Sequence, residues 1–234
     1  MRTFLFLCAV CLIVASFLQE TGAWPPKTTS NNNNPGLTIG NKWNSKANSC
    51  HRDLTLSEPD QLTAQVTGEN LGYRSSVFAV QPVPQINSGI FYYEVEIKGI
   101  VGAISIGLAT KQMALNKEVG EFQGYAYHFG SVFLCHEAEG CSYTHNVKRP
   151  YYNKGISPYA VGNVIGCGVD LAQHKIFYTL NGQRLGPAGL LADSADPLYP
   201  CVSLSHRGDI IAANFGPDFR FKFDIAKWNL ETEK

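Results

Sequence analysis

The sequence has few charged residues and no excess of either sign. Charged side chains make up 16% of the 234 residues, whereas roughly 25% is usual in a soluble domain. The 19 Lys and Arg are matched by 19 Asp and Glu, so the net charge is zero. A protein that binds nucleic acid needs a basic surplus or stripe to neutralise phosphates. The charge balance therefore argues against nucleic acid as a partner.

Methionine is scarce, with only 2 residues, whereas the chain contains 22 Gly, 12 Pro, 13 Phe and 11 Tyr. Glycine and proline interrupt helices, and aromatic residues favour strands. With 44% hydrophobic residues the chain is not disordered as a whole. The composition predicts an all-β protein built from short strands and many turns.

The motifs of common enzymes and metal sites are missing. The sequence around Ser105 does not fit Gly-x-Ser-x-Gly, and residues 162–168 lack the Lys-Ser/Thr of a phosphate-binding loop. Cys135, Cys141 and two nearby histidines do not have the spacing of a zinc site. Because no nucleophile, base and orienting group can be assembled, we expect no catalytic residues, no metal and no other cofactor.

The N-terminus carries the one long apolar run of the sequence. Residues 4–18 contain no charge, follow Arg2 and precede small residues that end at Ala23. This order of a basic, an apolar and a small-residue region is typical of a secretory signal peptide, and the run is shorter than the roughly 20 residues of a membrane span. We therefore predict that residues 1–23 are a signal peptide and that the mature protein is secreted without a membrane anchor.

The rest of the chain divides into a linker and one domain. Residues 24–40 hold two adjacent prolines, four consecutive asparagines and an Asn-Pro-Gly turn signal, so they are expected to form a linker. Residues 41–234 are predicted to form a single domain with its core at about 88–217. We expect this domain to be a monomer.

Five cysteines remain after removal of the predicted signal peptide. Cys167 and Cys201 lie in apolar, strand-like runs and are expected to be buried core thiols. Cys135 and Cys141 are separated by a short loop that could close as a disulfide if its ends pair.

Alternating apolar and polar residues predict strands over 90–98 and 103–109, joined by a turn into a hairpin. In the first strand the predicted buried face consists of Phe91, Tyr93, Val95 and Ile97. The face predicted to meet solvent consists of Tyr92, Glu94, Glu96 and Lys98.

Further strands are expected over 163–171, 175–180, 198–204 and 210–215. Between two of them Asn181-Gly182 predicts a type I′ turn, because both central residues of that turn need a positive φ. Strands at this spacing, with Gly-rich turns, indicate an antiparallel β-sandwich of two sheets.

Six segments in order carry a family resemblance: GIFYYEV at 89–95, IGLA at 106–109, VIGCGVDL at 164–171, FYTLNG at 177–182, LYP at 198–200 and ANFG at 213–216. The chain resembles a SPRY (B30.2) domain of the Ran-binding-protein-M type. The resemblance implies a bent sandwich of two antiparallel sheets that binds proteins through loops at one end and is not an enzyme.

With its predicted signal peptide the chain is similar to the secreted SPRY effectors of plant-parasitic cyst nematodes. That resemblance implies a host protein as partner, such as an immune receptor or a protein associated with one. It also implies delivery into the cytoplasm or nucleus of a plant cell, where the effector modulates or is detected by plant defence.

Aromatic and basic residues on predicted loops are the candidates for partner contact, because hot spots favour Tyr, Trp and Arg. The candidates lie in segments 73–75, 98–102, 125–130, 145–152, 185–189 and 205–207; they are Tyr73, Arg74, Tyr125, His128, Lys148, Arg149, Tyr151, Pro187, His206 and Arg207. In SPRY proteins that capture short peptides, the residues at the positions of Tyr125 and His206 line the pocket. The resemblance therefore implies that these two residues line a pocket here.

Three alternatives accompany these candidates. The alternative for Tyr125 and Tyr127 is that they are core aromatics of a strand. Segment 145–152 could be a solvated loop, and Pro187 is either a rigid hairpin tip or an ordinary turn proline. For the whole protein, the rival functions are a lectin-like sandwich, although the dense Asp/Asn cluster of a Ca²⁺ site is missing, and an orphan hydrolase.

Overall fold

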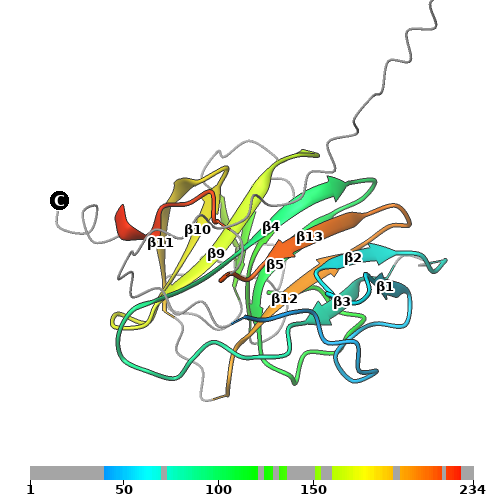
Figure 1. Cartoon of the computed structure of the whole chain (residues 1–234), viewed down its shortest axis with the longest axis horizontal. Helices are drawn as coiled ribbons and strands as arrows, with labels where there is room; N and C mark the ends of the chain where they lie inside the picture. The colour runs from blue at the N-terminus through cyan, green and yellow to red at the C-terminus, as the bar shows by residue number, and fades with distance from the viewer. Residues whose placement is uncertain are drawn as a thin grey trace, which may run out of the picture.

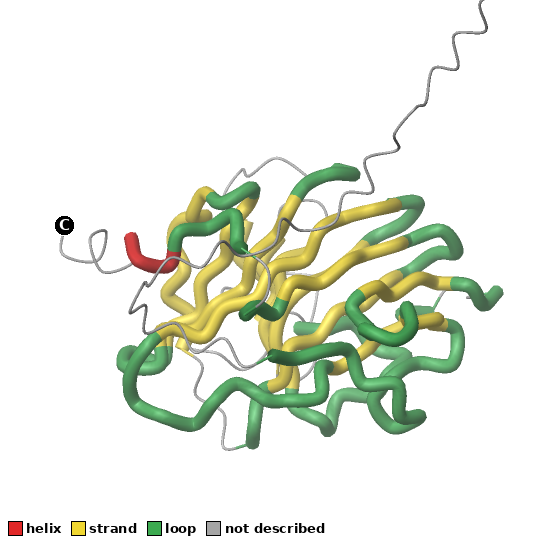
Figure 2. Tube along the Cα trace, in the orientation of Figure 1, coloured by secondary structure: helices red, strands yellow, loops and turns green. Residues whose placement is uncertain are grey.

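The structure, a computed structural model, describes residues 40–69, 73–120, 124–128, 132–135, 151–153, 160–191, 196–217 and 220–227. These residues form 13 strands and one short 3-10 helix, η1 (Ile225–Lys227). Figure 2 shows the strands in yellow and the helix in red. In the described part of the chain no helix is long and apolar enough to cross a membrane. The prediction of an all-β protein is confirmed.

The strands form two antiparallel sheets that pack face to face (Figure 1). The seven-stranded sheet contains, in spatial order, β1 (Leu54–Leu56), β2 (Thr63–Val66), β13 (Ile210–Asn214), β4 (Ile90–Gly99), β9 (Val164–Asp170), β10 (Lys175–Leu180) and β11 (Gln183–Leu191). The six-stranded sheet contains β3 (Ser75–Phe78), β12 (Tyr199–Leu204), β5 (Ile104–Ala109), β6 (Gly124–His128), β7 (Val132–Cys135) and β8 (Tyr151–Asn153). This arrangement confirms the predicted β-sandwich.

The predicted hairpin between β4 and β5 is wrong. β4 pairs with β9 and β13, whereas β5 pairs with β6 and β12 in the other sheet. Both strands have an apolar face, and they bury these faces against each other across the sandwich. The connection 100–103 therefore passes from one sheet to the other.

The turn between β10 and β11 has the predicted conformation, with φ of 53° at Asn181 and 79° at Gly182. Pro187 was predicted to lie at a rigid hairpin tip or in an ordinary turn, but it lies inside β11. Leu185 pairs with Tyr178 and Leu190 with Ile176, so residues 186–189 all lie opposite one residue of β10. A bulge in an edge strand tolerates proline because the missing N–H breaks no ladder hydrogen bond there.

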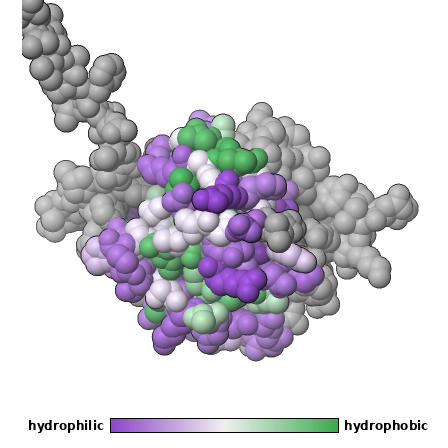
Figure 3. Space-filling model, turned by 90° about the vertical axis from the view of Figure 1, so that its right-hand side faces the viewer, coloured by the Kyte–Doolittle hydropathy of each residue, from purple (hydrophilic) through white to green (hydrophobic). Residues whose placement is uncertain are grey.

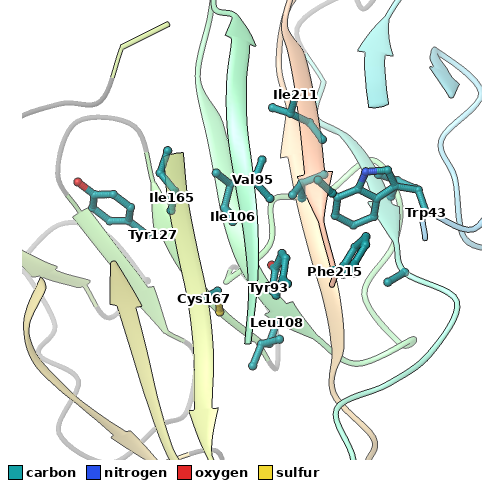
Figure 4. Packing of buried hydrophobic residues seen from close by; sticks show 14 of the residues in the cluster. Trp43, Tyr93, Val95, Ile106, Leu108, Tyr127, Ile165, Cys167, Ile211 and Phe215 are labelled. Carbon is teal, nitrogen blue, oxygen red and sulfur yellow. The ribbon is translucent and has the colours of Figure 1, made fainter. Parts of the chain in front are cut away.

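The core lies between the two sheets (Figure 4). Tyr93 of β4 stacks on Phe215 with ring centroids 5.4 Å apart, and Trp43 meets the same Phe215 ring edge-on at 5.0 Å. The Tyr93 hydroxyl donates to the carbonyl of Gly107 in β5 at 2.6 Å, which links the two sheets directly. Cys167 is fully buried among these residues, as predicted.

Cys201 is the second predicted core thiol, and it is fully buried on the outer side of the six-stranded sheet with Phe78 and Met113. Burial raises the pKa of its thiol. We expect Cys201→Ser to lower the free energy of unfolding by about 2 kcal/mol, because a hydroxyl is harder to desolvate than a thiol. Urea unfolding measures this, with Cys50→Ser, at a partly exposed position, as the milder control. Equal stability of the Cys201 variant and the parent would contradict the burial.

The face of β4 that was predicted to meet solvent is largely covered. Tyr92 and Glu94 are 1% and 0% exposed, because residues 220–227 pack over this side of the seven-stranded sheet. Glu96 remains partly exposed, and its Oε1 lies 2.9 Å from Nζ of Lys98. The alternation of the two faces is as predicted, but the second face is also buried over half its length.

Candidate protein-binding site

Strand register brings several predicted segments to one end of the sandwich. Ser75 pairs with Leu204, Leu204 pairs with Ile104, and Ser105 pairs with His128. The chain immediately before β3 and β5 therefore lies beside the chain immediately after β12. We call this region the loop end and define it as residues 73–74, 100–103, 205–209 and His128; it is on the right in Figure 1.

Asp209 joins loops 100–103 and 205–209 of the loop end. Its Oδ1 accepts the backbone N–H groups of Val101 at 2.7 Å and Gly102 at 3.0 Å. Its Oδ2 accepts those of Ser205 at 3.0 Å and His206 at 2.8 Å. The carboxylate is 0% exposed, and hydrogen bonds from backbone N–H groups to a buried charged acceptor are among the stronger ones in proteins. Asp209 thus clamps loop 100–103 to loop 205–209.

Ser205 and Gly102 complete this clamp. The Ser205 hydroxyl accepts the Ala103 N–H at 2.6 Å and lies 2.7 Å from Nδ1 of His206. A methyl group at position 102 would lie 1.9 Å from the same ring nitrogen. Glycine is therefore required there, and the imidazole of His206 is held against loop 100–103.

The clamped loops expose a mixed apolar and basic surface. Val101 is 67% exposed and Tyr73 is 62% exposed. His206 and Arg207, in the neighbouring loop 205–209, are also exposed. Figure 3, which faces this end, shows hydrophobic and hydrophilic patches interleaved. Exposed aromatic, aliphatic and arginine side chains on a rigid base are typical of protein interfaces. This surface can bind a protein.

Arg74 and His128, two of the predicted partner residues, also support the structure. Glu118 is 2% exposed, and its Oε1 lies 3.2 Å from Nη2 of Arg74, 2.6 Å from Nδ1 of His128 and 2.6 Å from the Ser105 hydroxyl. Burial by itself raises the pKa of Glu118, but the hydrogen bonds and charges of these three partners outweigh it and hold the pKa at about 2. Arg74 and His128 are only partly exposed, so they border the surface rather than dominate it.

Glu118 belongs to a segment that crosses the outer face of the six-stranded sheet. The Ser76 N–H donates to the Leu115 carbonyl at 2.9 Å, and the Ser203 hydroxyl accepts the Val119 N–H at 2.8 Å. These bonds place the carboxylate next to the loop end. The sequence reasoning did not identify Glu118, because nothing local to residues 110–120 reveals which strands it crosses.

Tyr125 does not belong to the loop end. It is 5% exposed and packs in the core between the sheets, as does Tyr127, which is fully buried. The structure thus supports the alternative explanation of both as core aromatics, and we remove Tyr125 from the candidate surface.

Other predicted residues cannot be placed. Lys148, Arg149 and Cys141 lie outside the described residues, so the 135–141 disulfide stays a prediction. Tyr151 is the first residue of β8 and Cys135 the last of β7. Among the residues that the structure describes, no three His, Cys, Asp or Glu side chains are grouped to hold a metal ion.

Val101 and Asp209 are functional candidates that the sequence reasoning did not single out. Val101 fell inside the predicted segment 98–102, and a β-branched residue between turn glycines was the available signal. Asp209 had no such signal, because two of its four N–H partners are more than 100 residues away in the sequence.

The fold and the loop end define a class: a two-sheet antiparallel β-sandwich with fixed loops at one end. The family model of the SPRY domain matches residues 90–218. The chain belongs to the SPRY domain family, whose members are protein-interaction modules, and this supports a protein-binding role.

Relatives agree with this assignment. The chain is 38% identical to Ran-binding protein 9 of Xenopus laevis over 156 residues, which is 64% of this chain and 25% of that protein. It is 37% identical to Ran-binding protein 10 of Danio rerio over 169 residues, 70% of this chain and 25% of that protein. The chain therefore spans about a quarter of the length of these relatives.

Solved structures agree on the fold. The crystal structure of a human SPRY domain is similar with a TM-score of 0.54 and 24% identity, covering 72% of this chain and 98% of that one. The SPRY domain of human HERC1 gives a TM-score of 0.52 at 14% identity, with 73% and 95% covered.

Proposed function

We propose that this protein is a secreted, non-catalytic effector that binds a host protein through its loop end and so modulates, or is detected by, plant defence. The signal-peptide pattern of residues 1–23 supports secretion. The resemblance to secreted nematode SPRY effectors supports the plant host and the delivery into its cells. The SPRY family supports a protein as the ligand.

The observation that carries the proposal is the clamp at Asp209. Binding loops usually lose conformational entropy when they meet a partner, and loops that are fixed beforehand lose less. Four backbone hydrogen bonds to one buried carboxylate fix loops 100–103 and 205–209 before any partner arrives. The protein acts by occupying a surface of its partner, and the exposed Val101, His206 and Arg207 form the contact.

Val101→Asp tests this surface. A charge in place of an exposed apolar side chain near the centre of an interface is expected to weaken partner binding by at least about tenfold, through desolvation of the new carboxylate. Ile86→Asp is the matched control, because Ile86 is an exposed aliphatic residue, 43% accessible, before the start of β4 and thus at the opposite end of the sandwich. It should bind like the parent.

Residues 24–234 of the parent and of both variants serve as bait in host-plant extract, and captured proteins are identified by mass spectrometry. The Kd of a purified candidate is then measured by calorimetry with the three chains. Loss of the captured protein with Val101→Asp, but not with Ile86→Asp, supports the loop end as the contact surface. Equal capture by all three chains contradicts it, and Ca²⁺-dependent binding to glycans in its place would favour the lectin function.

A further inference from the structure

The outer face of the seven-stranded sheet carries an aromatic platform built over two glycines. Tyr92 of β4 and Phe177 of β10 extend across β9 and stack at 5.8 Å with an interplanar angle of 8°. A methyl group on Gly168 would lie 2.2 Å from Cζ of Phe177, and one on Gly166 would lie 1.9 Å from the Tyr92 hydroxyl oxygen. The rings can lie flat over β9 only because neither residue has a side chain.

Glu94 lies beside these rings and is 0% exposed. Its Oε2 accepts the backbone N–H of Lys222 at 2.9 Å, and its Oε1 accepts that of Phe223 at 2.9 Å. The Tyr92 hydroxyl donates to the same Oε1 at 3.0 Å. The carboxylate thus binds the main chain of two consecutive residues, and the bend of the chain at residues 222 and 223 turns both N–H groups to the same side. We call Tyr92, Glu94 and Phe177 the platform.

Residues 220–227, which we call the strap, occupy the platform. Phe223 and Ile225 are buried and Phe221 is partly buried, whereas Lys222 and Asp224 are exposed. Phe221 meets the Tyr92 ring edge-on at 5.0 Å, and Phe223 meets it at 5.3 Å. The platform therefore selects aromatic and aliphatic side chains at every second position, and Glu94 fixes the register.

The strap contributes no strand to the sheet it covers. The order of the seven-stranded sheet runs from β1 to β11 without it, and the strap is held by a side-chain carboxylate and by ring contacts. Release of the strap therefore leaves every strand pairing of the sheet in place. It exposes the apolar rings and a buried carboxylate whose two N–H donors have gone, so the platform favours a replacement.

We propose that the platform is a peptide-binding site for segments with the pattern aromatic-x-aromatic-x-aliphatic, and that it takes the strap of a second copy of this chain. Every copy carries the segment Phe221–Ile225, and a strap from a neighbour makes the same contacts that the chain's own strap makes. Exchange of an identical element between copies needs no new surface. The result is a dimer in which one copy's strap completes the other copy's outer face.

The test mixes two full-chain variants. Phe223→Ala has an intact platform and a defective strap, and Glu94→Ala has an intact strap and a defective platform. The mixture is expected to form a 1:1 heterodimer by light scattering, whereas each variant alone does not dimerise by this route. A mixture that stays monomeric, with both variants folded by circular dichroism, would overturn the proposal.

A peptide probe decides the question if Glu94→Ala does not fold. The labelled peptide of residues 220–227 is expected to bind the Phe223→Ala chain, and to bind the parent at least about tenfold more weakly because the parent's own strap fills the platform. The same peptide with alanine at both phenylalanine positions should not bind. Failure of the parent peptide to bind the folded Phe223→Ala chain would likewise overturn the proposal.

Discussion

Replacing Asp209 with alanine is expected to lower the free energy of unfolding by about 4 kcal/mol. A buried donor left without an acceptor costs about 1–3 kcal/mol, and three of the four hydrogen bonds lost are only partly buried, so each costs near the lower limit. Four backbone N–H groups lose their acceptor at once, those of Val101, Gly102, Ser205 and His206. The loops should separate, because no other side chain described at this point joins as many of their N–H groups. Partner binding at the loop end should be lost with the stability.

Urea unfolding measures the loss of stability, and amide hydrogen exchange measures the separation of the loops. Exchange should accelerate at those four amides while the central strands keep their protection. Asp60→Ala is the matched control, because Asp60 is an exposed carboxylate that accepts the Leu62 N–H in a turn, and it should lose only about 1 kcal/mol. An Asp209→Ala chain as stable as this control would show that the loops do not depend on the clamp.

Replacing Glu118 with glutamine is expected to remove on the order of 3 kcal/mol of stability at neutral pH, since one pKa unit corresponds to about 1.4 kcal/mol. The pKa of Glu118 falls from 4.5 to about 2 in the folded protein, where Arg74, His128 and Ser105 surround the carboxylate. A lowered acid pKa stabilises the fold above the unfolded-state pKa. That stability is lost as the pH falls through the folded-state pKa.

The parent and the Glu118→Gln variant should therefore differ most above about pH 5 and converge towards about pH 2. Urea unfolding at a series of pH values gives this difference directly. Glu69→Gln changes an exposed carboxylate and should follow the parent at every pH. A constant gap between parent and Glu118→Gln down to pH 2 would show that the ion pairs contribute nothing.

Both variants act on the support of the loop end and not on its exposed side chains. Asp209 fixes loops 100–103 and 205–209, and Glu118 fixes Arg74 and His128 at the border of the same surface. A partner-binding surface gains affinity when its contacts are held in place beforehand, because less conformational entropy is lost on binding. Buried carboxylates therefore give this end of the sandwich the rigidity that the proposed binding through its loops requires.

The sequence predicted what depends on neighbouring residues. Alternation located β4, β5, β9, β10, β12 and β13 to within a residue or so, and Asn181-Gly182 identified its turn, because strand faces and turn φ angles are set within a few residues. Cys167 and Cys201 were correctly placed in the core because each lies in a locally apolar run. Composition alone was enough for the all-β class.

Only the tertiary structure decided which sheet each strand joins and what covers its outer face. The predicted hairpin of β4 and β5 failed because two alternating strands in succession can either pair or face each other, and the choice depends on their distant partners β9 and β12. Glu94 looked like a solvent-facing residue because its cover comes from residues 222 and 223. The same holds for the proposed binding surface: its exposed residues were visible in the sequence, whereas Asp209 and Glu118 act across long sequence separations that no local pattern encodes.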